Sequence, residues 1–267
     1  MRFACQTYSW QMSLDAYRGK LDHMVATAAA AGFVGVEPEI VMLGEDWTPG
    51  ALRAAVERHG VALAALCLVQ LWRGAEETAE EARAADMAID GVAAIPGAIL
   101  NLCQLPGGDR RDLLDRQRNA IACVAAVSER AADRGVHCTF HPNSPPGSIF
   151  RTAADYRVLL DGLPGQVGFT PDLGHVAKGG MRPLDLLTTY RDRIDHIHYK
   201  DVDAAGEWAP TGDGEIDFVG ATDYLARTGY QGWIVMEDES PRAQLDPDGA
   251  AVHNGQYVRT VLNGVPR

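Results

Sequence analysis

A chain of 267 residues with a formal net charge of −12 and an isoelectric point near 5.0 would repel a phosphate backbone, which argues against nucleic-acid binding. The residues are 46% hydrophobic and 22% charged, and no apolar run approaches the length that crosses a bilayer, so no membrane role is expected. No signal peptide is visible, and the five cysteines lack CxxC spacing, which predicts a cytoplasmic protein with reduced, buried thiols. Nothing resembles a linker, so we expect residues 1–267 to form one domain.

Short apolar segments of strand length alternate with longer segments rich in Ala, Leu, Arg and Glu, which is the pattern of repeated βα units around a parallel sheet. The predicted strands are residues 3–8, 34–39, 61–69, 98–103, 136–141, 167–172, 194–198 and 233–237. Eight alternations in a chain of this length favour a single closed (β/α)8 TIM barrel. A doubly wound open sheet with extra strands is the alternative.

The segments between the strands carry helical spacing and helix-end signals. Two apolar stripes predict core-facing helix surfaces: Leu21, Met24, Val25 and Ala28, and Leu113, Leu114, Ile121, Val124 and Val127. Thr48 followed by Pro49 is typical of a helix start, and Thr152 with Asp155 resembles a capping box. Four glycines are expected to end helices before the next strand: Gly32, Gly60, Gly135 and Gly229.

Polar residues gather at the C-terminal ends of the predicted strands, the face that carries the active site in barrels. Four of these ends offer metal-binding side chains: His141, Asp172, His198 and Glu237. Two imidazoles and two carboxylates suit a divalent transition metal and leave positions open for a substrate. Mn²⁺ is the first expectation, and Co²⁺, Fe²⁺, Zn²⁺ and Mg²⁺ are the other candidates.

Four motifs in the C-terminal half carry a family resemblance. They are TPDLGH (170–175), HIHYKD (196–201), TGDGEIDF (211–218) and GYQGWIVMED (229–238). With these motifs in this order the chain resembles the sugar phosphate isomerase/epimerase superfamily of xylose-isomerase-like barrels. That superfamily includes ketose 3-epimerases, inosose dehydratases and endonuclease IV relatives. The N-terminal half supports the resemblance only by its alternation of predicted strands and helices.

The resemblance implies metal ligands at Asp172, His198 and Glu237. Family epimerases usually place a glutamate at the end of strand five, whereas this chain has His141, as inosose dehydratases tend to have. In the epimerases two metal-bound glutamates act on opposite faces of the substrate carbon. His141 therefore argues against a symmetric two-base epimerisation, so elimination gains ground and stands nearly level with isomerisation or epimerisation.

The resemblance also implies substrate contacts at Glu37, His175 and Lys200. Asn143 follows the fifth strand and is a further candidate. Trp10 and Trp72 follow strand ends, where an indole ring is placed to stack on a sugar.

The expected chemistry is proton abstraction next to a carbonyl. A divalent ion that binds a carbonyl and a neighbouring hydroxyl acidifies the C–H between them and stabilises the enediolate. The candidate acid and base groups are Glu237, His175 and Lys200, and their individual roles stay open. Return of the proton gives isomerisation or epimerisation, and loss of a β-hydroxyl gives dehydration. Few basic residues follow the strands, so an unphosphorylated keto-sugar or cyclitol is expected.

Other polar residues receive structural expectations. His196 is expected to point to the opposite side of its strand from His198. Asp201 is expected to pair with a loop or helix, and Glu39 and Glu239 are expected to be solvated charges at the rim of the barrel. Two alternative functions remain: an endonuclease IV-like metal phosphodiesterase, and a catalytically inactive barrel that acts as a binding subunit. A homo-oligomer is compatible with the sequence.

Overall fold

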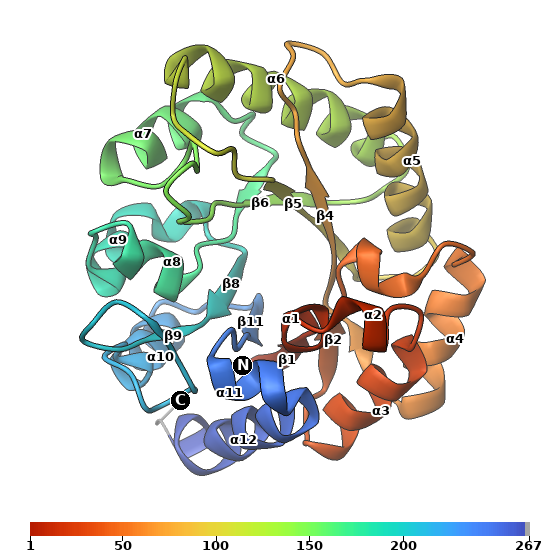
Figure 1. The fold of residues 1–267 in the computed structure, drawn as a ribbon, viewed down its shortest axis with the longest axis vertical. Helices are drawn as coiled ribbons and strands as arrows, with labels where there is room; N and C mark the ends of the chain where they lie inside the picture. Colours follow the sequence, from red (N-terminus) through yellow and green to blue (C-terminus); the bar gives the residue numbers. More distant parts are fainter. Residues whose placement is uncertain (265–267) are drawn as a thin grey trace.

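The computed structural model describes residues 1–264, in which eight strand positions form a ring surrounded by helices (Figure 1). In chain order the strands are β1 (Arg2–Gln6), β2 (Gly35–Glu37), β3 and β4 (Ala62–Leu63 and Ala65–Gln70), β5 (Ile99–Gln104), β6 (Cys138–His141), β7 (Gly168–Phe169), β8 (His196–Tyr199) and β11 (Trp233–Met236). β3 and β4 together fill the third position. The predicted strands therefore all exist.

Every ladder between neighbouring strand positions is parallel. β3, β2, β1, β11 and β8 form one run, and β4, β5, β6 and β7 form the other. Isolated bridges join the two runs: Glu39 pairs with Cys67 on one side, and Phe169 with Ile194 and Asp172 with His198 on the other. The sheet closes on itself, which confirms the (β/α)8 barrel.

The helices cover the outside of the ring. They are α3 (Leu21–Ala30), α4 (Pro49–His59), α5 (Ala79–Ala93), α6 (Leu113–Ala132), α7 (Ala153–Gly162), α8 (Leu173–Lys178), α9 (Pro183–Tyr190), α10 (Phe218–Arg227) and α12 (Pro247–Thr260). Shorter elements are α1 (Tyr8–Gln11), α2 (Leu14–Tyr17), α11 (Pro241–Leu245), and the 3-10 turns η1 (Ile40–Leu43), η2 (Arg191–Arg193) and η3 (Leu262–Gly264). An antiparallel hairpin of β9 (Asp201–Val202) and β10 (Trp208–Ala209), which the sequence did not predict, follows β8.

The predicted helix ends are confirmed. Thr48 Oγ1 accepts the Ala51 amide at 3.2 Å, and Thr152 with Asp155 forms a capping box. All four predicted C-terminal glycines have positive φ. One stripe residue was wrongly placed: Leu114 is 49% exposed, because adjacent helical residues lie about 100° apart and Leu113 already faces the core.

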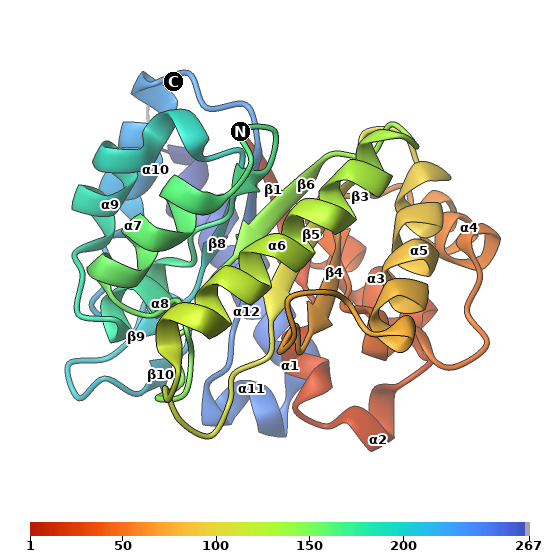
Figure 2. The same cartoon turned by 90° about the horizontal axis from the view of Figure 1, so that it is seen from above.

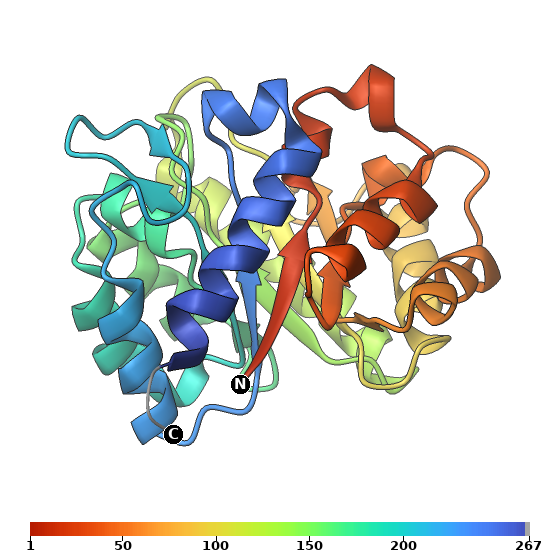
Figure 3. The ribbon, with the colours of Figure 1, turned by 90° about the horizontal axis from the view of Figure 1, so that it is seen from below.

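The strand ends place polar side chains on one face of the barrel. Figure 2 shows both chain termini on one face and α1, α2, α11 and the β9–β10 hairpin on the opposite face. In Figure 3, β1 starts near the N-terminus and points toward that opposite face. The C-terminal ends of the parallel strands therefore meet beneath these short elements. Within residues 1–264, no helix combines the length and apolar character needed to cross a membrane.

Candidate metal centre and cavity

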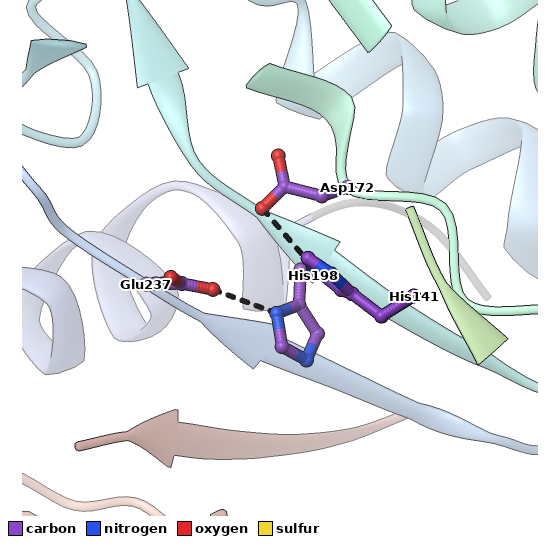
Figure 4. A group of neighbouring side chains, drawn as sticks. All are labelled: His141, Asp172, His198 and Glu237. Carbon is purple, nitrogen blue, oxygen red and sulfur yellow. Dashed lines mark hydrogen bonds and ion pairs between the residues drawn. The ribbon is translucent and has the colours of Figure 1, made fainter. Parts of the chain in front are cut away.

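Four potential donors converge at the C-terminal ends of consecutive strands (Figure 4). His141 ends β6, His198 belongs to β8, and Glu237 follows β11. Asp172 follows β7 and caps α8, where its Oδ1 accepts the His175 amide at 2.8 Å. One ligand atom from each of the four residues lies within 4.8 Å of the others, and all four residues are buried. The structure thus brings together the residues that the sequence predicted as ligands.

Two atoms of this cluster are buried without a hydrogen-bond partner: His141 Nε2 and Asp172 Oδ2, which lie 3.7 Å apart. Asp172 Oδ2 also lies 3.2 Å from Lys200 Nζ, without the geometry of a hydrogen bond. Buried polar atoms are normally paired, since leaving them unpaired costs free energy. Unpaired nitrogen and oxygen lone pairs facing one point fit a divalent cation of the transition series.

Glu37 lies behind this cluster and is fully buried. Its carboxylate lies 2.6 Å from His196 Nε2 and 3.2 Å from His198 Nε2, and it accepts from Asn101 Nδ2 at 2.7 Å. Burial alone would raise the pKa of Glu37, but His198 and His196 hold it well below its ordinary value. Such a carboxylate orients a metal-binding imidazole from its far nitrogen.

His198 lies between two carboxylates, because its Nδ1 is 2.7 Å from Glu237 Oε2 while its Nε2 faces Glu37. Burial would lower the pKa of His198, yet Glu37 and Glu237 raise it to about 10. The surroundings of His198 are therefore strongly anionic and attract positive charge.

One expectation changes at this point. His196 was expected to point away from His198, which is wrong: residues two apart on a strand share a face, and both imidazoles reach Glu37. Glu37 was expected to touch substrate, and that stays a prediction: in this structure Glu37 is not among the residues that line the cavity, and its carboxylate faces His196 and His198.

Lys200 and His175 lie beside the cluster. Lys200 is 1% exposed, and its Nζ donates to Glu237 Oε1 at 2.8 Å and to Glu239. Burial would lower the pKa of Lys200, but Asp172, Glu237 and Glu239 raise it well above its ordinary value, so it is a cation. Burial and Lys200 hold the pKa of His175 well below its usual value, so His175 is neutral. Since His175 Nε2 accepts from Lys200 at 3.1 Å, Nδ1 donates to Ser144 Oγ at 2.8 Å.

A cavity of about 170 Å³ lies in front of these groups. The predicted site residues that line it are His141, Asn143, His175, His198 and Glu237. Asn143 is held by its amide, which donates to the Gln104 carbonyl at 2.8 Å. An apolar and thiol wall completes the cavity: Cys67, Val69, Cys103, Leu105, Pro106 and Pro145.

Neither predicted stacking tryptophan lines the cavity. Trp10 is fully buried, and its Nε1 donates to Asp248 of α12 at 2.6 Å. Trp72 is 1% exposed, and its backbone amide donates to Glu81 at 2.7 Å. Their expected contact with a sugar ring therefore gains no support from this structure.

Two acidic residues of the cavity were missed. Glu39 and Glu239 were expected as solvated rim charges, but both are largely buried and line the cavity. Glu39 follows Glu37 by two residues, and Glu239 follows Glu237 by two. The two-residue period of a strand was therefore a signal that could have found them.

Comparison with known proteins assigns the chain to a family. Residues 25–260 match the family model described as xylose isomerase-like TIM barrel. The chain belongs to this family. The match covers most of the barrel, including all four potential metal donors.

Among curated proteins, this xylose isomerase-like barrel is similar to an inosose dehydratase of Lacticaseibacillus casei, with 29% identity over 155 residues. That alignment covers 51% of this chain and 52% of the relative. The rhizopine catabolism protein MocC of Rhizobium meliloti is 34% identical over 139 residues, which cover 45% of this chain and 42% of that protein. The alignments thus span about half of the curated relatives' length.

Solved structures share the fold over nearly the whole chain. The IOLI protein with a binding zinc atom superposes with a TM-score of 0.76 at 15% identity, covering 100% of this chain and 99% of that one. The 3-keto-D-glucoside 4-epimerase YcjR of E. coli superposes with a TM-score of 0.75 at 19% identity, covering 97% and 99%. At these identities the likeness concerns the fold.

Proposed function

We propose that this barrel is a divalent-metal-dependent lyase that removes water from an unphosphorylated keto-sugar or cyclitol, as an inosose dehydratase does. The observation that carries the proposal is the cluster of His141, Asp172, His198 and Glu237, three of which line a cavity, with Lys200 beside Asp172. His141 at the fourth donor position and the inosose dehydratase relatives favour elimination over epimerisation. A cytoplasmic location is part of the proposal.

The four clustered residues would hold the ion, with Mn²⁺ as our first choice. When bound, the ion would supply Lewis acidity that polarises the substrate carbonyl and makes the neighbouring C–H acidic. Glu37 fixes the orientation of His198 from its far nitrogen. The remaining steps belong to side chains of the cavity.

His175 is our candidate for the base that takes the C–H proton. Its imidazole lines the cavity, and Ser144 fixes its ring through Nδ1, so Nε2 is the acceptor. Nε2 accepts from Lys200 in this structure, and His175 would take the C–H proton once that ammonium turns to the substrate oxygen. Lys200, which does not itself line the cavity, carries a positive charge 3.1 Å from Nε2 and would stabilise negative charge that develops on the substrate. Glu237 is ionised, since Lys200 and His198 outweigh its burial and lower its pKa to about 2.

Elemental analysis tests the metal site. Purified wild type should hold about one ion per chain, while His141→Ala and Asp172→Ala should lose it because each removes a donor. Asp133→Ala, which removes a carboxylate from an exposed position, serves as the control and should retain the ion. A wild-type protein that binds none of Mn, Co, Fe, Zn and Mg would refute the proposal.

A substrate panel tests the reaction. The metal-loaded protein is incubated with keto-inositols and keto-sugars, and products are identified by mass spectrometry. A product lighter by one water supports elimination. A product of unchanged mass and altered structure or configuration would show that the reaction is isomerisation or epimerisation and not elimination. Cleavage of DNA at abasic sites would favour the endonuclease-like alternative, and metal binding without any reaction would favour a binding subunit.

A further inference from the structure

Glu39 is a carboxyl of the cavity wall that the proposed metal site does not use. It lies two residues beyond Glu37, the last residue of β2, on the same strand face, and it is 8% exposed. Its backbone is fixed on two sides: its amide donates to Thr7 Oγ1 at 3.3 Å, and it forms a bridge with Cys67. Glu39 is therefore held in place at the cavity.

The side chain of Glu39 has one polar partner among the described residues. Oε2 accepts from Gln11 Nε2 at 2.9 Å, and Gln11 also lines the cavity. Within residues 1–264, no Lys, Arg or His lies at ion-pair distance from this carboxyl. The nearby ammonium of Lys200 is instead paired with Glu237 and Glu239. Among the described residues, Oε1 has no hydrogen-bond partner, and the residue lines the cavity.

Apart from Gln11 and the nearby Lys200, the titratable groups around Glu39 are acids. They are Glu37 on its own strand, Glu237 and Glu239 after β11, Tyr8 in α1, Cys67 in β4 and Cys103 in β5. Burial raises the pKa of Glu39 to about 7, and Glu237, Glu239 and Glu37 contribute in the same direction, against the amide of Gln11. A carboxyl that carries its proton near neutral pH is suited to donate it.

The place of Glu39 in the ring puts it across from part of the proposed metal site. Eight strand positions form the ring, and Glu39 follows the strand at the second, β2. Asp172 follows β7, four positions away and so directly opposite, and His141 ends β6, three positions away. Glu39, His141, His198 and Glu237 line the same cavity. A molecule held by the clustered donors thus presents its other side toward Glu39.

We propose that Glu39 is a further catalytic residue of this chain, the acid that protonates the departing β-hydroxyl in the elimination. The inference rests on the proposed function and extends it. The base takes the C–H proton, and the electron pair of that bond forms the new double bond. The C–O bond breaks, its electron pair stays on oxygen, and that oxygen takes the proton of Glu39 and leaves as water. The resulting carboxylate regains a proton from solvent, and the base releases its own.

The test separates C–H cleavage from loss of the hydroxyl. Wild type and Glu39→Gln are loaded with metal and incubated with a keto-inositol in deuterium oxide. NMR follows deuterium uptake next to the carbonyl, and absorbance follows the unsaturated product. Glu39→Gln keeps the size of the side chain and a partner for Gln11, so metal content and deuterium uptake should stay near wild type. Elimination should fall by roughly 100- to 10,000-fold, the usual contribution of general acid catalysis.

A better leaving group supplies the second readout. A keto-inositol analogue with β-fluoride in place of β-hydroxyl needs less help from an acid, so Glu39→Gln should eliminate fluoride much closer to the wild-type rate. Glu45→Gln, which changes an exposed glutamate paired with Arg18, is the matched control and should behave as wild type. If Glu39→Gln does not fold, Glu39→Asp, which withdraws the acid by one methylene, should show the same separation of the two rates.

Unchanged elimination of water by Glu39→Gln, or an equal loss of deuterium uptake and elimination, would overturn the role of Glu39. Failure of the proposed function looks different. In that case wild type itself would form no unsaturated product, whether or not it binds metal or takes up deuterium.

Discussion

The carboxylate behind the metal cluster gives a quantitative test. Glu37→Gln keeps the shape of the side chain but replaces the anion that faces His196 Nε2 at 2.6 Å and His198 Nε2 at 3.2 Å. The glutamine amide offers one acceptor where the carboxylate offers two. Loss of a carboxylate that orients a ligating histidine typically weakens metal binding roughly 10- to 100-fold, or about 1.4 to 2.8 kcal/mol. One imidazole N–H left unpaired in this buried place should also lower the free energy of unfolding by about 1 to 3 kcal/mol.

Metal affinity of Glu37→Gln is measured by competition with a fluorescent chelator, and stability by urea unfolding of the metal-free protein. Glu45→Gln is the control for loss of one acidic charge. If folded Glu37→Gln binds the ion with an affinity within twofold of wild type, Glu37 does not orient His198, and its role as the support of a metal ligand is wrong.

In metal-free protein the pKa of Glu39 is about 7 in the folded state and 4.5 in the unfolded chain. The folded protein therefore holds this proton more tightly, and the resulting contribution to stability is complete below pH 4.5 and is lost as the pH rises through 7. Glu39→Gln should therefore gain up to about 3 kcal/mol relative to wild type between pH 5 and pH 8, and parallel unfolding profiles would refute this. Thr78→Ala breaks the capping box of α5 and should cost about 1 kcal/mol in urea unfolding; an unchanged midpoint would contradict the cap. Gly174→Ala brings a Cβ within 2.6 Å of the Lys200 carbonyl and should destabilise the fold by about 1 to 3 kcal/mol, while Gly165→Ala, whose Cβ meets open space, should not.

The strands could be predicted because each is a short apolar run between helix-end signals. Their bounds depend on partners elsewhere in the chain. The predicted third strand breaks at Ala64 because β3 pairs with β2 whereas β4 pairs with β5. The sixth is reduced to β7, because beyond it only the bridge between Asp172 and His198 continues the pairing, and the Asp172 side chain caps α8.

The metal cluster could be predicted because strand ends of a closed barrel converge on one face. The tryptophans could not be placed in the same way. Trp10 is buried under α12, whose Asp248 binds its indole from 238 positions later in the sequence. Glu39 was missed for a different reason, because net acidity suggested solvated charges whereas its strand face determined its burial.

The metal cluster lies where β7 meets β8, and this position links metal binding to the stability of the barrel. This part of the ring closes through isolated bridges, and one of them pairs Asp172 with His198, a proposed ligand on each side. An ion held by both residues would act as a cross-link over one of the two places where only isolated bridges join the strands, and its binding free energy would add to the stability of the closed ring. Selection for catalysis and selection for a closed fold would then act on the same two side chains.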